Sequence, residues 1–490
     1  MDHSAGTMSD RVVVSRARNQ AALLVAAAYA VLGTILLLTR FVGLGHSFWF
    51  DELFFVAHFV REGPSEILAG PDLSHELMAI ATWATSSIVG ESETAFRLWS
   101  VVPFVAGVTV VTAWLHSRVD ALSGVLFLFL ATVSPLLLDI TRQARGYGLA
   151  FLAMSILVVA ALEAVRDGRT APVVAMCVAG VVGTWTLPQL SIGFLATGAV
   201  VAIERRVRRP TVIGLGLSVA AIAAWYAPHV GQVQAASQIE DGLQIHTTWL
   251  ITAPIDQVVL PALIWIEGTT VVPGVVWLPF VALCVLVMGF SPLVRELQSA
   301  LILFTGTIAT VVVLWIGQAY VIPRYLSFLL VPAFVLLASG ASTILRSSPS
   351  KRSVIPTALC LTVVVVLIVN FASIAPDVVR LPREANRDAA EVIAARAVRG
   401  TSLLATVRHT NSIEFYLRRP LPTVAPSQVV HRVCDATRPV VYVRQIWAIT
   451  LVRVPCLKRG GVERYRLRQY ARGGEIDVWV IPPGRVERGS

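Results

Sequence analysis

Two adjacent carboxylates, Asp51 and Glu52, directly follow the first long apolar segment and lie between aromatic residues in the run 48–53. A charge so close to hydrocarbon is costly, and it therefore points to function. A carboxylate there can act as a general base toward a hydroxyl nucleophile, and a phosphate leaving group needs no acid from the protein. Asp51 is our candidate base, and Glu52 is a second candidate catalytic residue. The alternative is structural, because Asp51 can also cap a helix that begins at Glu52.

A second group of polar residues follows in the same loop, in the run 71–76. Glu76 is a further candidate catalytic carboxylate. Asp72 and His75 are candidates for binding substrate, and the imidazole suits a phosphate or an acceptor group. Ser74 or Asp72 can instead begin a capping box for a helix over 75–89. The sequence leaves both interpretations open.

Arginines occur in segments that the charge pattern assigns to the outer side of a membrane. Two of them lie in the short run 139–147. Basic residues are usually concentrated on the cytoplasmic side, so arginines on the outer side should have a partner that offsets the cost of placing them there. Phosphate is the natural partner because guanidinium groups match its oxygens in pairs. Lipid headgroups and a salt bridge to Asp139 are the alternatives. The candidate substrate-binding residues of these segments are Arg97, Arg142, Arg145, Tyr147, Arg324 and Tyr325.

The composition assigns most of the chain to lipid. Of its 490 residues, 56% are hydrophobic and 14% are charged, and the mean hydropathy is +0.72. Soluble domains carry roughly 25% charged residues. About 20 apolar residues are needed to cross a bilayer as a helix. The expected spans are 21–44, 97–117, 121–138, 147–165, 171–187, 189–204, 211–228, 271–290, 297–317, 325–345 and 354–375, with Pro188 marking either a tight hairpin or a broken helix.

The distribution of basic residues predicts an orientation. Most of those in the expected loops fall on the side of the N-terminal tail, 1–20, so this side is expected to be cytoplasmic. About eleven spans then place the C-terminal region outside. Two outer loops are long, 45–96 and 229–270. The first contains apolar stretches near 53–60 and 77–89, which suit helices lying in the membrane interface.

Residues 376–490 are expected to form a separate soluble domain. This region carries 20 Lys/Arg against 10 Asp/Glu residues. Its positive charge can face anionic headgroups or an acidic polymer, or simply water. Segment 386–398 has the pattern of an amphipathic helix, and the runs 402–407, 439–444 and 476–481 have the composition of strands. A small α/β or α+β fold is the prediction.

Cysteine usage adds one constraint. Three of the five cysteines lie in apolar runs, where they are expected to pack as small apolar residues. Cys434 and Cys456 lie in the polar C-terminal region and can form a disulfide if that region is extracytoplasmic. Two free thiols are the alternative. The sequence has no Cys/His spacing typical of a metal site, so we predict none.

Short motifs in a fixed order resemble the GT-C glycosyltransferases, most closely the branch of protein O-mannosyltransferases and aminoarabinose transferases. The similarity covers most of residues 20–375 in layout, and a soluble domain after the last span also suits this family. The motifs that carry the resemblance are the Asp-Glu pair at 51–52, His75 at the start of a loop helix, the run 90–100, Ser134-Pro135 followed by 142–147, and 323–325.

The resemblance implies an all-α polytopic protein of the cell (inner) membrane with a small extracytoplasmic α/β domain. It also implies a hexosyl- or pentosyltransferase that uses a polyprenyl-phosphate sugar at the outer face. The catalytic acidic residue of this family corresponds to Asp51. The donor is a substrate, and we expect no cofactor. The chain departs from the family at His75-Glu76-Leu77, where the family often has His followed by two prolines, and the departure adds a carboxylate.

We therefore expect an inverting transferase in which Arg142, Arg145 and Arg324 hold donor phosphate while Asp51 activates an acceptor hydroxyl. The acceptor can be a glycan, a glycolipid or a secreted protein, and no nucleic acid is expected as a partner. Three other functions stay open: a polymerase or ligase of lipid-linked glycans, a glycolipid flippase or transporter, and a non-catalytic membrane scaffold. A transporter would need ionisable residues near the middle of the membrane, whereas these cluster at its outer boundary.

Overall fold

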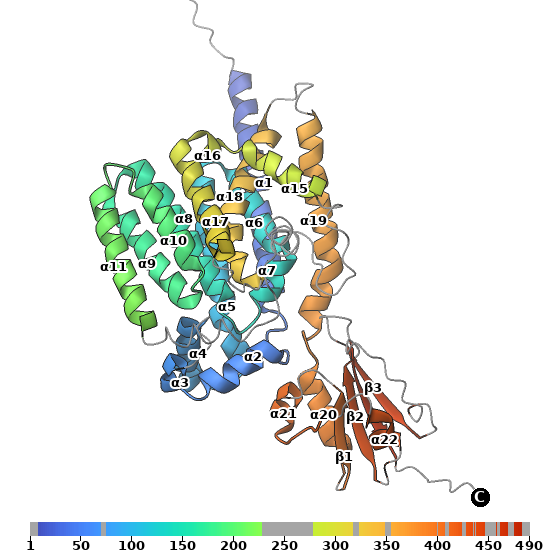
Figure 1. Ribbon diagram of the computed structural model, residues 1–490. Coiled ribbons are helices and arrows are strands. Elements are labelled where there is room, and N and C mark those ends of the chain that lie inside the picture. Colours follow the sequence, from blue (N-terminus) through green and yellow to red (C-terminus); the bar gives the residue numbers. More distant parts are fainter. Residues whose placement is uncertain are drawn as a thin grey trace, which may run out of the picture.

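The structure is a computed structural model in which a helical bundle carries a small mixed sheet at one end (Figure 1). The two parts of the molecule are joined by the end of a single long helix. The described residues are 8–69, 75–227, 278–316, 323–347, 354–398, 400–406, 411–423, 428–434, 436, 438–445, 457, 461–468 and 475–482.

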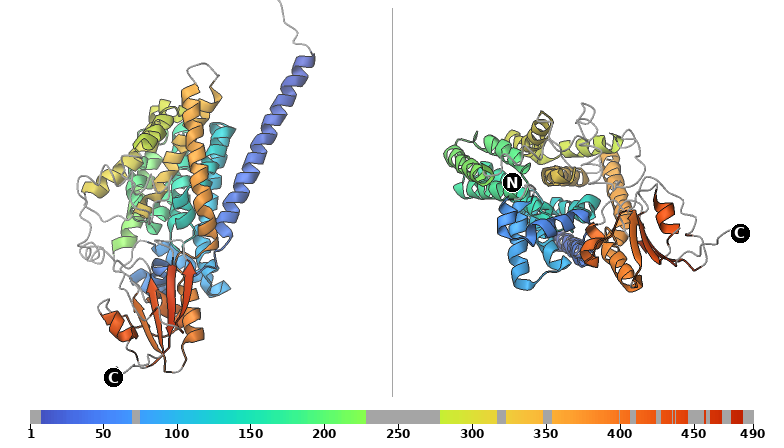
Figure 2. Two further views of the ribbon diagram at one scale, coloured as in Figure 1. Left: turned by 90° about the vertical axis from the view of Figure 1, so that its right-hand side faces the viewer. Right: turned by 60° about the horizontal axis from the view of Figure 1, so that its bottom comes forward.

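Long apolar helices run side by side through the bundle (Figures 1 and 2). Among the described residues, six helices are long and apolar enough to cross a bilayer, which agrees with the expected polytopic membrane fold. That there are eleven spans stays a prediction. The bundle helices are α1 (Met8–Phe41), α5 (Glu93–Arg118), α6 (Ala121–Val133), α7 (Pro135–Ile140), α8 (Tyr147–Asp167), α9 (Thr170–Thr186), α10 (Leu190–Val201), α11 (Arg208–Tyr226), α15 (Leu278–Gly289), α16 (Pro292–Arg295), α17 (Leu297–Ile316), α18 (Leu330–Arg346), which follows the 3-10 helix η5 (Pro323–Leu329), and α19 (Val354–Arg380).

The helix α8 lies in the middle of the bundle, packed between α5 and α9. Its five alanines and its single glycine, Gly148, allow the neighbouring helices to approach closely. At Gly148 the approach is so close that a Cβ atom would overlap the carbonyl oxygen of Ser100 on α5. The aromatic rings of Phe104 and Phe151 fill the next layer, with their centroids 4.9 Å apart.

The expected span 121–138 is interrupted, because α6 ends at Val133 and α7 begins at Pro135. Proline has no backbone N–H, so the carbonyl of Ala131 loses the donor that a continuous helix would supply. The fully buried Arg40 at the end of α1 takes its place. Its guanidinium group donates to the carbonyls of Ala131, at 3.1 Å, and of Thr132, at 3.4 Å. Arg40 therefore supplies hydrogen-bond donors to the C-terminal end of α6.

The first expected outer loop, 45–96, is built from short helices at the end of the bundle where α5 and α8 begin (Figure 1). The predicted helices near 53–60 and 77–89 are both present. The helices of this loop are α2 (Phe50–Phe55), which continues as the π-helical turn η1 (Val56–Val60), α3 (Pro64–Ala69) and α4 (Glu76–Val89). Pro188 lies in a tight hairpin, since α9 and α10 pack against each other.

The C-terminal region forms the predicted small α/β fold next to the first outer loop (Figures 1 and 2). Its sheet has the strand order β1-β2-β4-β3, with β1 parallel to β2 and the other pairs antiparallel. The elements of the domain are α20 (Asn386–Arg396), β1 (Ser402–Thr406), α21 (Asn411–Leu417), α22 (Val429–Cys434), β2 (Val440–Gln445), β3 (Glu463–Arg468) and β4 (Glu475–Ile481).

Three of the four strands match the predicted runs, and β3 was missed. Its sequence, ERYRLR, alternates charged residues with Tyr465 and Leu467 and lacks the β-branched residues that favour strands. Tyr465 and Leu467 pack on the core that α20 and α21 share with the sheet, while the arginines occupy the other face. The preceding helix α19 runs to Arg380, past the expected limit of 375, although the domain limits themselves stay predictions.

Replacing Gly148 by alanine should lower the free energy of unfolding by about 1–3 kcal/mol, because the new Cβ forces α8 away from Ser100. Thermal unfolding of the purified protein in detergent measures the change. Gly216→Ala on α11 is the matched control, since an added Cβ there meets nothing within 4 Å. If both variants lose equal stability, close approach of α5 and α8 is not the reason for glycine at 148.

Candidate active site

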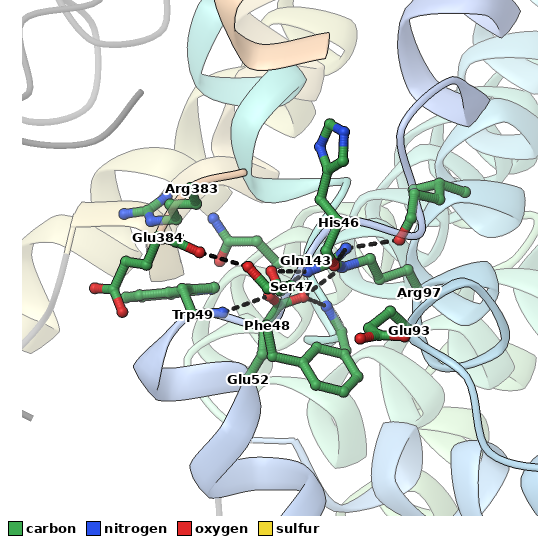
Figure 3. Close-up of polar contacts among 12 residues, drawn as sticks. His46, Ser47, Phe48, Trp49, Glu52, Glu93, Arg97, Gln143, Arg383 and Glu384 are labelled. Atoms are coloured by element: carbon green, nitrogen blue, oxygen red, sulfur yellow. Dashed lines mark hydrogen bonds and ion pairs between the residues drawn. The ribbon is translucent and has the colours of Figure 1, made fainter. Parts of the chain in front are cut away.

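The centre of the candidate site is a buried ion pair between Glu52 of α2 and Arg97 of α5 (Figure 3). Only 1% of the Glu52 side chain and 6% of the Arg97 side chain are exposed. The guanidinium fork donates from Nε to Oε1 at 2.8 Å and from Nη2 to Oε2 at 2.7 Å. This bidentate geometry is the strongest form of an arginine–carboxylate contact.

Two backbone groups complete the environment of the Glu52 carboxylate. The N–H of Ala144 donates to Oε1 at 2.6 Å, and the N–H of Trp49 donates to Oε2 at 3.3 Å. A buried charge is tolerated only when such hydrogen bonds replace its lost hydration. With four donors on one carboxylate, Glu52 is suited to holding the site together. Its predicted role in catalysis stays untested.

Arg97 also binds the chain that leads from α1 into the first loop. Nη1 donates to the carbonyls of Leu44, at 2.6 Å, and His46, at 2.7 Å, and Nη2 donates to that of Ser47 at 3.2 Å. This segment is not helical, so its buried carbonyls need donors from elsewhere. One arginine therefore fixes both the Glu52 carboxylate and the path of the chain toward it.

The turn 141–146, between α7 and α8, lies between the starts of two loop helices. Ala144 contacts Glu52, and Nη1 of Arg145 lies 3.4 Å from the backbone oxygen of Asp51. On its other side, the N–H of Gly146 donates to Nδ1 of His75 at 3.2 Å. The turn therefore brings predicted residues from three segments together.

Gly146 and Tyr147 explain how this close arrangement is possible. A Cβ at Gly146 would lie 2.6 Å from Cγ2 of Thr186 and 2.8 Å from Nδ1 of His75, so no larger residue fits without movement. The ring of Tyr147 packs edge-on against the imidazole of His75, with the centroids 5.2 Å apart. Both side chains are almost completely buried.

Asp51 is half-buried in the first turn of α2. The helix begins at Phe50, one residue before Asp51, and Trp49 occupies the N-cap position. The structural alternative, in which Asp51 caps a helix beginning at Glu52, is therefore not observed. Successive helical residues point about 100° apart, so the inward direction of Glu52 leaves its neighbour at the edge of the buried centre.

Arg142 and Asp139 connect the turn to two other helices. Arg142 is 7% exposed and donates from Nη1 to the carbonyl of Thr39 near the end of α1. Asp139 is 2% exposed, pairs with Arg383 just beyond α19, and accepts a hydrogen bond from Gln143 at 3.1 Å. A salt bridge to Asp139 is therefore present, but its partner is Arg383, which the sequence analysis did not consider.

Glu76 occupies a second polar cluster on the other side of His75. Its carboxylate is 2% exposed and accepts a hydrogen bond from the indole N–H of Trp225 at the end of α11. The ring of Trp225 stacks on that of Trp185, with the centroids 4.6 Å apart. Glu76 is the first residue of α4, and His75, its N-cap, makes no side-chain capping bond.

Several predicted residues lie outside the described part of the chain. Asp72 and the outer loop 229–270 are among them. Arg324 and Tyr325 belong to η5, which packs against α7 and α8, although their side chains are outside the described part. Cys434 is disulfide-bonded. Because Cys456 is outside the described residues, the predicted bond between the two stays a prediction.

The sequence analysis missed Arg383, Trp185 and Trp225. Of these three residues, only Arg383 could have been proposed from the sequence. It is a charged residue shortly after the last expected span, 354–375, on the side to which the other candidate arginines were assigned. The two tryptophans had no signal beyond their place at the ends of apolar runs. Among the described residues, no three His, Cys, Asp or Glu side chains gather as they would around a metal ion.

Comparisons with known proteins identify the fold. No family model matches this sequence, and no curated protein matches it. The structure is similar to ArnT from Cupriavidus metallidurans in the apo state, with a TM-score of 0.53 and 14% identity over 94% of this chain and 98% of ArnT. The same protein bound to undecaprenyl phosphate gives a TM-score of 0.52 and 14% identity over 93% of this chain and 98% of ArnT.

A more distant likeness is to the oligosaccharyltransferase AglB from Archaeoglobus fulgidus, with a TM-score of 0.48 and 13% identity over 86% of this chain and 69% of AglB. ArnT is an aminoarabinose transferase of the GT-C class of glycosyltransferases. The likeness to ArnT extends over nearly the whole of both chains. The predicted resemblance to the GT-C class is thus confirmed at the level of the fold.

Replacing Glu52 by glutamine should lower the free energy of unfolding by about 3–5 kcal/mol, because it leaves the Arg97 charge buried without its counter-ion. The matched control is Glu91→Gln. Glu91 pairs with Arg61 at the same 2.7 Å distance, but these side chains are 46% and 43% exposed, so the loss should be about 0–1 kcal/mol. Thermal unfolding of both variants in detergent checks this, and equal losses would contradict it.

His46 should make the protein less stable in acid. Burial lowers its pKa, the guanidinium groups of Arg142, Arg97 and Arg387 lower it further, and Asp388 opposes them. The folded state then binds fewer protons than the unfolded state. Stability from this group is present above the unfolded pKa of about 6.5 and is lost as the pH falls through the folded pKa.

Thermal midpoints at pH 7.5 and pH 5 measure this loss in wild-type protein and in His46→Asn. Many other groups also titrate in this interval, so the difference between the two proteins is what matters. The variant should lose less stability than wild type on acidification. An identical pH dependence of the two proteins would show that His46 does not contribute.

Proposed function

We propose that this protein is a membrane glycosyltransferase. In this proposal it transfers a sugar from a polyprenyl-phosphate donor to an acceptor hydroxyl at the outer boundary of the membrane, with inversion at the anomeric carbon. The acceptor is a glycan, a glycolipid or a secreted protein. The protein would lie in the inner membrane, with its soluble domain outside the cytoplasm.

The observation that carries the proposal is a buried polar centre at one end of an apolar bundle (Figure 3). Burial of so many charges is costly, and such residues at a membrane boundary are by default functional. Arginine is also the residue that best matches phosphate oxygens. The buried members of this centre are Arg97, Arg142, Arg145, Arg383, Glu52, Asp139 and, beyond His75, Glu76.

The fold gives independent support. The ArnT structure that this chain resembles was also determined bound to undecaprenyl phosphate, a polyprenyl phosphate. A donor of this type carries a charged phosphosugar on an apolar chain, so its reacting carbon would lie at the membrane boundary. The polar centre lies at the end of helices that are apolar enough to cross the bilayer, and this position supports such a donor.

The chemistry assigned to the centre is a single displacement. The acceptor oxygen attacks the anomeric carbon, the bond from that carbon to the phosphate oxygen breaks, and the polyprenyl phosphate leaves with the electron pair. A carboxylate accepts the proton of the acceptor hydroxyl as the new bond forms. The arginines Arg142 and Arg145 would hold the phosphate, with Arg324 as a third candidate, and no acid is needed for this leaving group.

Asp51 is the preferred base for two reasons. Its side chain is half-buried and therefore partly exposed, whereas Glu52 is almost completely buried and accepts from four donors. Asp51 also adjoins Arg145, whose guanidinium lies against its backbone oxygen. A carboxylate beside the phosphate-binding arginines is where a base for this reaction is needed. Glu76, in its aromatic surroundings, is the second candidate.

The test is to incubate the purified protein with a panel of polyprenyl-phosphate sugars in the presence of glycan, glycolipid and peptide acceptors, and to measure release of the carrier phosphate. Asp51→Asn should lower the rate by about 10²–10⁴-fold, because the base is lost, with an unchanged thermal midpoint. The control is Asp167→Asn, since Asp167 lies near Arg118 at the opposite end of the bundle. Wild-type release by Asp51→Asn would overturn its role as base. No release with any donor would favour a flippase or a scaffold.

A further inference from the structure

We propose that the soluble C-terminal domain is a positioning element of the transferase, and that Tyr416 and Asn386 set the direction of Asp51 by holding the backbone of Phe48. This inference rests on the proposed function, because it gives the domain a role in the same reaction. Tyr416 and Asn386 are positioning residues, since neither is required to touch the substrate.

Phe48 lies two residues before α2, where the chain has no helical partner of its own. Its backbone N–H donates to Oη of Tyr416 at 2.7 Å, and its carbonyl accepts from Nδ2 of Asn386 at 3.1 Å. Phe48 and Asn386 are each 3% exposed. Both backbone polar groups of this buried residue are therefore satisfied by the soluble domain, and a buried group left without such a partner is costly.

Neighbouring residues strengthen the same attachment (Figure 3). The hydroxyl of Ser47 donates to the carbonyl of Glu384. Arg383 pairs with Asp139, and its guanidinium carbon lies 4.0 Å from the centre of the Trp49 ring. The segment just after α19 thus contacts both the entry to α2 and the helix α7 before the turn that carries Arg142 and Arg145.

The N-terminus of α5 provides the link between the domain and the buried ion pair. Glu93, in its first turn, accepts hydrogen bonds from Tyr416 at 3.3 Å and from Arg387 at 3.1 Å. Arg97 follows Glu93 by one helical turn and therefore lies on the same face of α5. The soluble domain and the Glu52 carboxylate are thus bound by adjacent residues of one helix.

Tyr416 also joins two hydrophobic cores. Its ring packs against the cluster of the first outer loop and against the core between α20, α21 and the sheet. Arg61 of the loop lies over the neighbouring ring of Phe415, 4.5 Å from its centre. Because Tyr416 belongs to both cores, movement of the domain must shift the start of α2, and Asp51 lies within the first turn of this helix.

The test compares Tyr416→Phe with Tyr465→Phe, which removes a hydroxyl that donates to Glu463 of the same strand and, among the described residues, does not contact the first loop. The readouts are kcat and the KM for the donor, together with hydrogen exchange of the backbone amides in 45–53. In Tyr416→Phe the Phe48 amide should exchange faster and kcat should fall roughly tenfold, since small misplacements are costly to catalysis. The donor KM should change less than about twofold, because uniform substrate binding is not removed.

Tyr416→Phe combined with Asn386→Ala should enlarge both effects, and Tyr465→Phe should change neither. A wild-type kcat in a folded variant whose Phe48 amide exchanges faster overturns the proposal. So does unchanged exchange at Phe48. If wild-type protein transfers no sugar, the proposed function fails, and the exchange measurement alone decides whether the domain holds the loop.

Discussion

The ion pair between Glu52 and Arg97 is the constraint on which the arrangement of this site depends. Its two charges are buried, so each must keep its full set of hydrogen bonds. The carboxylate obtains them from Arg97 and two backbone amides, and the guanidinium also binds three carbonyls. The chain entering α2 and the turn after α7 have to meet around this pair.

The same logic explains why arginines are numerous at this end of the bundle. Helix ends leave carbonyls without donors, and Arg40 and Arg142 donate to such oxygens at the ends of α6 and α1. Arg97 does the same for the non-helical segment that follows α1. The cost of burying these arginines is therefore offset in part within the protein. In the proposed function, phosphate would bind at an electropositive centre whose arginines also stabilise the fold.

Sequence patterns predicted the helices well because apolar runs of span length have few other structures available in lipid. The short helices of the first loop and three strands of the soluble domain were also predicted. The roles of Asp51 and Glu52 could not be separated, since adjacency says nothing about which side chain points inward. That depends on Arg97, which lies far along the chain, and Arg383 was missed because only folding brings it to Asp139.

The boundary between the helical bundle and the C-terminal domain is a change of composition, and residues on its two sides contact each other directly. Phe48 belongs to the first loop by sequence, yet its backbone hydrogen bonds belong to the C-terminal domain. Arg383 lies beyond the last apolar helix, yet its charge pairs with Asp139 in the helix before the 141–146 turn. Movement of the C-terminal domain would therefore reach the start of α2 through the side chains that bind the Phe48 backbone, without any residue of that domain touching the substrate.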